Sequence, residues 1–137
     1  MYPPELVAPM AKDLTEFGFN GLSSAEEVDQ LFSNPDDSFL LVVNSVCGCA
    51  AANARPAAKI AMQYHKKPTK AYTVFAGVDK EATAKAREYL LPYPPSSPAI
   101  ALFKEGRLVH MIERHHIEGR SAQMIASNLA EAFDAFC

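Results

Sequence analysis

The spacing of hydrophobic residues changes several times along the chain, and each change marks an expected element. Near the start, apolar residues recur every three or four positions, which predicts an amphipathic helix that Gly18 and Gly21 close. Its apolar positions are Leu6, Val7, Met10, Leu14 and Phe17. Ser24 and Glu27 then have the spacing of a capping box and predict a second short helix, on the surface of the protein, which the Asn34-Pro35 pair ends.

Two strand-like runs follow, and a helix is expected after each. Residues 39–43 (FLLVV) are all apolar, which is typical of a strand covered on both faces. An alanine-rich segment over about 50–67 predicts a helix, and residues 71–76 predict the next strand. Asp79 is the expected cap of a further helix that ends near Leu90. Together these elements form a βαβ unit followed by a helix.

The last third of the chain predicts a turn, two strands and a closing helix. Four prolines within residues 92–98 exclude a helix there and indicate an ordered turn onto a strand at 99–103. Residues 104–106 (KEG) supply a tight connection to an antiparallel strand at 107–112. A closing helix is expected over about 120–136 because its apolar residues form one stripe.

The predicted order of elements is α, α, β, α, β, α, β, β, α, which places a βαβ half and a ββα half around one mixed sheet. This is the thioredoxin topology with one additional helix in front. We therefore expect an α/β protein with a thioredoxin-like fold, in which helices flank a central mixed β-sheet. The length of 137 residues fits one domain, so residues 1–137 are expected to form a single thioredoxin-like domain.

Charge and apolar run length exclude several classes of partner. With 13 Lys and Arg against 16 Asp and Glu, the chain has no basic excess that would favour nucleic acid. No apolar run approaches the roughly 18 residues of a membrane-spanning helix, and the first residues lack the pattern of a signal peptide. Three cysteines do not resemble the disulfide framework of a secreted domain. A cytoplasmic protein with free thiols and no membrane partner is therefore expected.

Cys47 and Cys49 are the candidate catalytic residues, because they lie where the apolar strand gives way to a helix. Backbone N–H groups and the positive end of the helix dipole would stabilise a thiolate at Cys47, and the thiolate is the nucleophile of disulfide exchange. Gly48 gives the turn the freedom to bring Cys49 within reach as a resolving thiol. A ring closed by one intervening residue would be strained, which predicts a couple more oxidising than that of a CxxC pair.

Two other interpretations of the cysteine pair stay open. Both cysteines could be buried structural thiols. They could also bind a soft metal such as Cu(I) or zinc, which would need further ligands from Cys137 or the histidines. His115 and His116 are adjacent and are expected to diverge, and no CxxC or HxxxH spacing adds support for a metal site. Cys137 itself is expected to be an exposed, frayed thiol, with a catalytic role or a partner-trapping role as the alternative.

Ser97 and Pro98 are the second candidate element of the site. They directly precede the strand at 99–103, where thioredoxin folds place a cis-proline that faces the active cysteines and leaves a strand edge for an extended substrate. An ordinary trans turn would need no function. Pro56 is expected to kink the helix, and its neighbour Arg55 to be solvated. Lys66, Lys67 and Lys70 are likewise expected to form a solvated face.

Three stretches of the chain resemble the bacilliredoxin family, thioredoxin-like proteins built around a Cys-Gly-Cys site. They are YPPELVAPM, NSVCGCAAANARP and SSPAIALFKEGRLVHMIERHHIEGR, and the resemblance extends over nearly the whole chain. It implies a thiol-disulfide oxidoreductase that removes bacillithiol from mixed disulfides on oxidised proteins, with Cys47 as the attacking thiol and Cys49 as the resolving partner or a modulator. Weak disulfide isomerase activity would suit such a pair.

The resemblance also implies bacillithiol as the co-substrate, with no other cofactor, and bacillithiolated or oxidised proteins as partners. The chain departs from thioredoxin itself in having no tryptophan, one spacer residue between the cysteines, and no carboxylate on the FLLVV strand. Activation of Cys47 is therefore expected to rest on the helix terminus. A soft-metal carrier and an adaptor that reuses the fold are the alternative functions, and the oligomeric state stays open.

Overall fold

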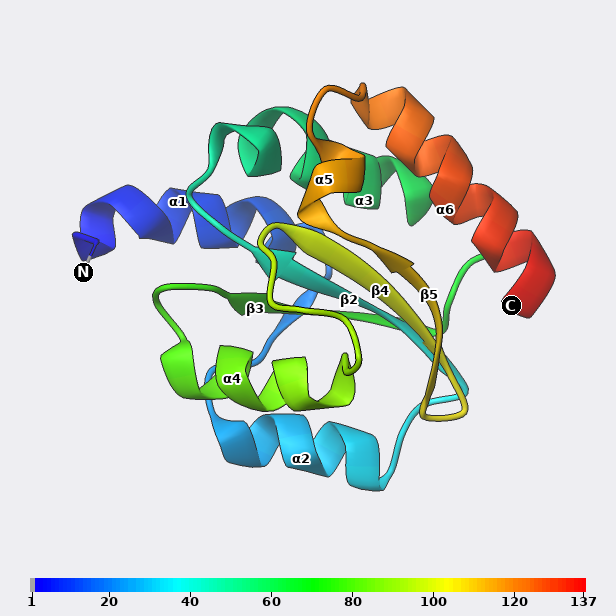
Figure 1. Ribbon diagram of the computed structural model, residues 1–137, viewed down its shortest axis with the longest axis horizontal. Helices are drawn as coiled ribbons and strands as arrows, with labels where there is room; N and C mark the ends of the chain where they lie inside the picture. Colours follow the sequence, from blue (N-terminus) through cyan, green and yellow to red (C-terminus); the bar gives the residue numbers. More distant parts are fainter. Residues whose placement is uncertain (1) are drawn as a thin grey trace.

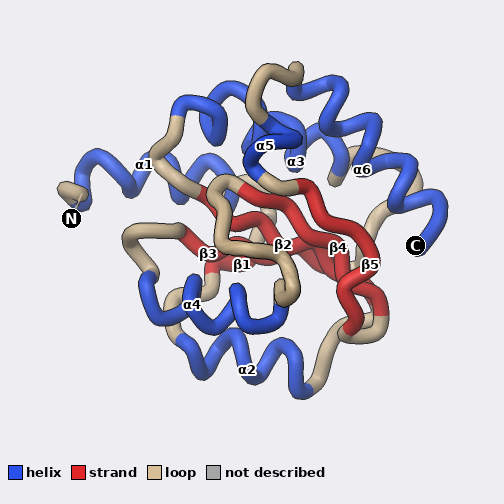
Figure 2. The backbone as a smooth tube through the Cα atoms, in the orientation of Figure 1, coloured by secondary structure: helices blue, strands red, loops and turns tan. Residues whose placement is uncertain are grey.

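The computed structural model describes residues 2–137 and consists of a five-stranded mixed sheet between two layers of helices (Figures 1 and 2). The strands are β1 (Asn20–Gly21), β2 (Ser38–Asn44), β3 (Lys70–Phe75), β4 (Ala99–Lys104) and β5 (Arg107–Ile112). The helices are α1 (Pro4–Thr15), α2 (Ala25–Ser33), η1 (Ala50–Ala54), α3 (Arg55–Ala61), α4 (Lys80–Tyr89), α5 (Arg114–Ile117) and α6 (Ala122–Phe136). This arrangement confirms the expected α/β class and mixed sheet.

The strand order in the sheet is β1-β3-β2-β4-β5. β2 lies at the centre, parallel to β3 and antiparallel to β4. All seven of its residues are buried, as the unbroken apolar run predicted. β1 was not predicted, because its two residues, Asn and Gly, carry no apolar pattern, and only their parallel pairing with β3 makes them a strand.

The two faces of the sheet carry separate hydrophobic cores. Leu40 and Val42 of β2 point to the core shared with α1, α3 and α6, whereas Phe39, Leu41 and Val43 point to the core shared with α2 and α4. This division follows from the alternation of side chains along a strand. α2 and α4 lie side by side below the sheet in Figure 1, and the other helices lie above it. Because Val28 of α2 is fully buried, this helix contributes to the core as well as to the surface.

The helix expected over 50–67 is shorter and less regular in the structure. Helical turns begin at Gly48, widen into the π-helical segment η1, and continue as α3, which ends at Ala61. Pro56 lies where η1 passes into α3, so its missing N–H falls at the change from π-helical to α-helical hydrogen bonding. The structure thus has a π-turn next to the residue where a kink was expected. Beyond Ala61 the chain turns toward α6, since Tyr64 and Lys66 both hydrogen bond to Asp134. Lys66 therefore has a hydrogen-bond partner in α6, whereas the sequence predicted contact with solvent alone.

α5 was also missing from the sequence-based prediction. Four residues are too few to reveal a helical period, and the helix is fixed by tertiary packing, because Ile117 is fully buried in the core. After α5, Ser121 caps α6 by accepting a hydrogen bond from the Met124 amide. Within residues 2–137, no helix has both the length and the apolar composition needed to cross a lipid bilayer.

Candidate active site

Cys47 lies in the turn between the end of β2 and the first helical residue, Gly48. Its amide donates to the Ser45 hydroxyl oxygen at 3.2 Å, and its carbonyl accepts from the Ala50 amide at 2.9 Å. β2 is buried along its whole length, but Cys47 is partly exposed. The turn therefore delivers this residue from the centre of the sheet to the surface at the start of a helix, as the sequence predicted.

The pKa values of the two cysteine thiols are shifted in opposite directions. The hydrogen bond from the Cys49 side chain is the main cause that lowers the pKa of the Cys47 thiol. Burial of Cys47 acts in the opposite direction. The amides of Cys49 and Ala50 and the charge of Arg114 lower the pKa further. The Cys49 amide lies 3.4 Å from the Cys47 sulfur. Burial raises the pKa of the Cys49 thiol, and its hydrogen bond to Cys47 and the charge of that thiolate raise it further.

This difference in acidity assigns different chemistry to the two thiols. As the pH rises, Cys47 loses its proton first and becomes the better nucleophile, while Cys49 remains a thiol that can donate to it. The sequence-based argument relied on the helix terminus alone. In the structure the Cys49 side chain contributes the most, and the backbone amides and a cationic side chain assist it.

The Ser97-Pro98 peptide bond is cis and lies at the same edge of the sheet as the cysteine turn. Val43 near the end of β2 pairs with Ala99 at the start of β4, so the residues just beyond this pair, Asn44 on one strand and Pro98 on the other, are also neighbours. Pro98 is buried and Ser97 is partly exposed. The structure thus brings together the two segments that the sequence proposed as site elements, and it contains a second cis bond, Leu91-Pro92, that was not anticipated.

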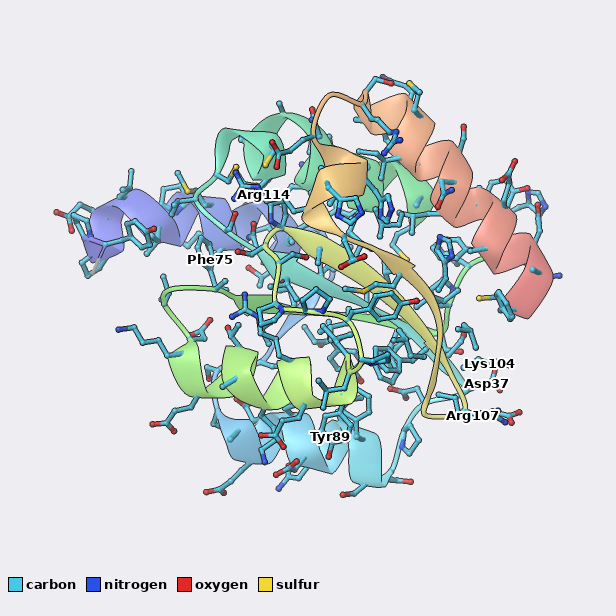
Figure 3. The ribbon with its side chains drawn as sticks, in the orientation of Figure 1. Asp37, Phe75, Tyr89, Lys104, Arg107 and Arg114 are labelled. Carbon is cyan, nitrogen blue, oxygen red and sulfur yellow. The ribbon has the colours of Figure 1, made fainter. Side chains whose placement is uncertain are left out.

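Arg114 of α5 also belongs to this site, and the sequence analysis missed it. Its Nη1 donates to the Ser97 carbonyl at 3.3 Å, and its Nε donates to Glu118 at 2.8 Å. Its charge adds to the lowering of the Cys47 pKa and opposes the raising of the Cys49 pKa. Figure 3 shows Arg114 between α5 and the turn that follows β2. The one sequence signal was its position inside the third stretch that resembles bacilliredoxins.

Arg55 is buried beneath the cysteine turn, which corrects the expectation that it would be solvated. Only 5% of the residue is exposed. Nη1 donates to Asn44 Oδ1 at 3.0 Å and to the Ser45 carbonyl at 3.1 Å. Asn44 Oδ1 also accepts from the Ser45 amide, so one guanidinium fixes the two residues that lead from β2 into the turn.

Asp13 of α1 supplies the countercharge for this arginine. Its carboxylate accepts from Arg55 Nε at 3.1 Å and from Lys59 Nζ at 2.6 Å. Burial alone would raise the pKa of Asp13, but the hydrogen bond and charge of Lys59 and the charge of Arg55 outweigh it and lower the pKa. The additional N-terminal helix is therefore joined by ionic contacts to α3, whose Arg55 holds the residues that lead into the Cys47 turn.

Cys137 lies far from the candidate site. Its thiol hydrogen bonds to Ser38 at the start of β2, whereas Cys47 follows the end of that strand. Seven residues of strand separate the two positions, or roughly 20 Å. Cys137 is also partly buried against the core rather than exposed, and burial raises the pKa of its thiol. Figure 3 shows Lys104 and Asp37, whose charges act on Cys137, at the end of the sheet opposite Arg114.

His115 and His116 do not diverge, contrary to expectation. Their ring centroids are 4.0 Å apart, and the His116 Nδ1 accepts the Glu113 amide, which turns the ring back toward the start of α5. Potential ligand atoms of Glu113, His115 and His116 lie within 4.8 Å of one another. Among residues 2–137, this is the one group of three such side chains, and neither Cys47 nor Cys49 belongs to it.

Comparison with known proteins finds one matching family. A family model described as "Disulphide isomerase" matches residues 2–137. A bacilliredoxin of Cytophaga hutchinsonii is 58% identical over 134 residues, which cover 98% of each chain. The chain belongs to the bacilliredoxin family. A second bacilliredoxin, from Halalkalibacterium halodurans, is 50% identical over 99% of this chain and 94% of its own.

Solved structures place this bacilliredoxin among thioredoxin-fold proteins. A putative oxidoreductase with a thioredoxin fold covers 82% of this chain and 91% of its own at a TM-score of 0.65 and 18% identity. Fasciola hepatica thioredoxin covers 87% of this chain and all of its own at a TM-score of 0.59 and 16% identity. Identities this low show the fold alone. Together with the family relatives, they make the protein a member of a thiol-disulfide oxidoreductase family.

Proposed function

We propose that this bacilliredoxin removes bacillithiol from mixed disulfides on oxidised proteins, with Cys47 as the nucleophile. The observation that carries the proposal is the contact between the two residues: the Cys49 amide lies 3.4 Å from the Cys47 sulfur, and the pKa of Cys47 is lowered while that of Cys49 is raised. A thiolate at Cys47 with a protonated neighbour is the state that disulfide exchange requires. The name bacilliredoxin, which the relatives carry, supports this class of substrate.

In the proposed reaction, the Cys47 thiolate attacks the bacillithiol sulfur of the mixed disulfide. The original S–S bond breaks, a new S–S bond joins bacillithiol to Cys47, and the protein substrate leaves as a thiolate that takes a proton from water. Cys49 can then lose its proton and attack the Cys47 sulfur, which releases bacillithiol and leaves a Cys47–Cys49 disulfide. Gly48, Ser97 and Pro98 are the proposed substrate-binding residues, because they border the same turn.

A bacillithiolated carrier protein tests this proposal. The wild-type protein is expected to release the adduct, Cys47→Ser is expected to release none, and Cys49→Ser is expected to accumulate bacillithiol on Cys47. Cys137→Ser is the matched control and is expected to behave as wild type, because Cys137 lies at the other end of β2. Intact-protein mass spectrometry reports all of these species. Unchanged release by Cys47→Ser would refute the assignment.

Weak disulfide isomerase activity is a second candidate function, favoured by the description of the family model. The same Cys47 thiolate would attack a wrongly paired protein disulfide, and the liberated protein thiol would later displace Cys47. Recovery of activity from scrambled ribonuclease tests it: recovery should disappear in Cys47→Ser and persist in Cys137→Ser. We do not propose a metal-binding function, since no third ligand joins the cysteine pair in the described part of the chain.

A further inference from the structure

Arg114 has hydrogen-bonding capacity that its contacts in the protein leave unused. A guanidinium has five N–H donors. Glu118 accepts the donor on Nε, and the Ser97 carbonyl accepts one on Nη1. The side chain is 46% exposed. It is thus held in one place by two contacts while part of its planar donor edge faces solvent.

The position of this arginine links the two halves of the site. Through Ser97 it contacts the segment that contains the cis-proline, and its charge reaches both thiols. The Ser96 hydroxyl accepts the Arg114 amide at 3.4 Å, so the backbone of α5 is attached to the same segment. A small molecule joined to the Cys47 sulfur would therefore lie next to a fixed cation.

We propose that Arg114 is a specificity-determining residue that binds a carboxylate on the low-molecular-weight thiol attached to Cys47. The inference rests on the proposed exchange reaction and adds the substrate feature that the site recognises. The guanidinium matches a carboxylate through two parallel hydrogen bonds, and a lysine at the same position could not reproduce that geometry.

The contact with Ser97 favours a small thiol over an acidic peptide as the source of the carboxylate. An extended peptide that added to the sheet edge would use the Ser97 carbonyl as a backbone acceptor. Arg114 already uses one of the two lone pairs of that carbonyl, so an added peptide would have to share the acceptor with the guanidinium. A carboxylate on a small thiol can use the free donors of the guanidinium while the Ser97 contact stays intact.

Arg114 could instead act only on the Cys47 thiolate, and a pair of matched probes separates the two roles. A carrier protein with one exposed cysteine is loaded with 3-mercaptopropionate or with its neutral amide, 3-mercaptopropionamide. Transfer of each adduct is measured as kcat/KM for the wild type, Arg114→Gln, Arg114→Lys and the control Arg120→Gln. Arg120 is a suitable control because its guanidinium binds the His116 carbonyl and is not among the groups that act on either thiol.

The ratio of the two rates isolates carboxylate recognition, because any change in Cys47 reactivity affects both probes equally. The wild type and Arg120→Gln should prefer the carboxylate probe about fivefold, as expected for a partly exposed ion pair. Arg114→Gln should bring the ratio close to one, mainly through KM, and Arg114→Lys should give an intermediate ratio. The preference should weaken at high salt.

Three results would contradict these expectations in distinguishable ways. A wild-type ratio near one would overturn the inference, and so would an equal loss with both probes in Arg114→Gln, which would assign Arg114 to thiolate stabilisation alone. Transfer of both probes by Cys47→Ser at the wild-type rate would instead refute the proposed function.

Discussion

The carboxylate of Asp13 in α1 and the guanidinium of Arg55 at the start of α3 form an ion pair directly behind the turn that carries Cys47. The arginine is almost fully buried and also donates to Asn44 and to the Ser45 carbonyl. The helix that precedes the common thioredoxin topology therefore takes part in holding the turn that carries Cys47. Asp13 precedes Arg55 by 42 residues, so the position of Cys47 depends on contacts between distant parts of the chain.

Replacement of Arg55 should destabilise the protein strongly. Arg55→Met keeps most of the side-chain length but removes the donors to two buried oxygens and to Asp13, which should lower the free energy of unfolding by about 2–3 kcal/mol. Urea unfolding followed by circular dichroism measures this. The control Lys85→Met removes two surface ion pairs, with Asp29 and Glu88, and should cost less than about 1 kcal/mol. Equal losses in both variants would contradict a structural role for the Arg55 network.

Acid should weaken the Asp13–Arg55 contact in a defined pH window. The pKa of Asp13 is lowered in the folded state from an ordinary value of 3.8, so its stabilising contribution is complete above that value. The contribution is lost as the pH falls below 3.8 through the folded-state pKa. The stability difference between the wild type and Asp13→Asn should therefore be constant at neutral pH and shrink in this acid range. A difference that grew on acidification would contradict the assignment.

The side chain at position 49 should set the acidity of Cys47. Cys49→Ala removes the hydrogen-bond donor that contributes most to lowering the pKa of Cys47, so the midpoint of the alkylation rate should move to higher pH. Cys49→Ser keeps a donor at the same position and should leave the midpoint closer to that of the wild type. The pH dependence of iodoacetamide labelling at Cys47, resolved by peptide mass spectrometry, measures both shifts. Identical midpoints in the two variants would exclude this hydrogen bond as the cause.

The three thiols should react with alkylating reagents in a fixed order. Cys47 has a lowered pKa and should react first at neutral pH, whereas the raised pKa values of Cys49 and Cys137 keep these thiols protonated. Time-resolved labelling of the wild type reports the order. Unfolding in urea should abolish it, because the burial and hydrogen bonds that separate the pKa values are then lost. Faster labelling of Cys137 than of Cys47 in the folded protein would contradict the assignment.

Local patterns were sufficient to predict most elements of the fold. The FLLVV run identified the central strand because a strand buried on both faces is made mainly of apolar side chains. The Ser24 and Glu27 spacing identified the start of α2, where both hydrogen bonds of the capping box are present. The position of Cys47 between β2 and the following helix also followed from neighbouring residues alone.

Features that depend on distant partners could not be predicted from such patterns. Arg55 contacts a residue 42 positions earlier, and Arg114 contacts Ser97, 17 positions earlier. A charged side chain gives no local sign of whether such a partner exists, so solvation was the natural expectation for Arg55. The proximity of His115 and His116 is a different case, because the contact that orients His116 is local: its Nδ1 accepts the amide of Glu113, three residues earlier.

The π-helical segment η1 lies between the turn that follows β2 and Arg55, which is anchored to Asp13. Its hydrogen bonds span one residue more than those of an α-helix. η1 therefore takes up an additional residue between two segments that the contacts of Arg55 with Asn44 and Ser45 already hold together. The number of residues between Cys49 and Arg55 thus suits a π-turn and not a regular α-helix.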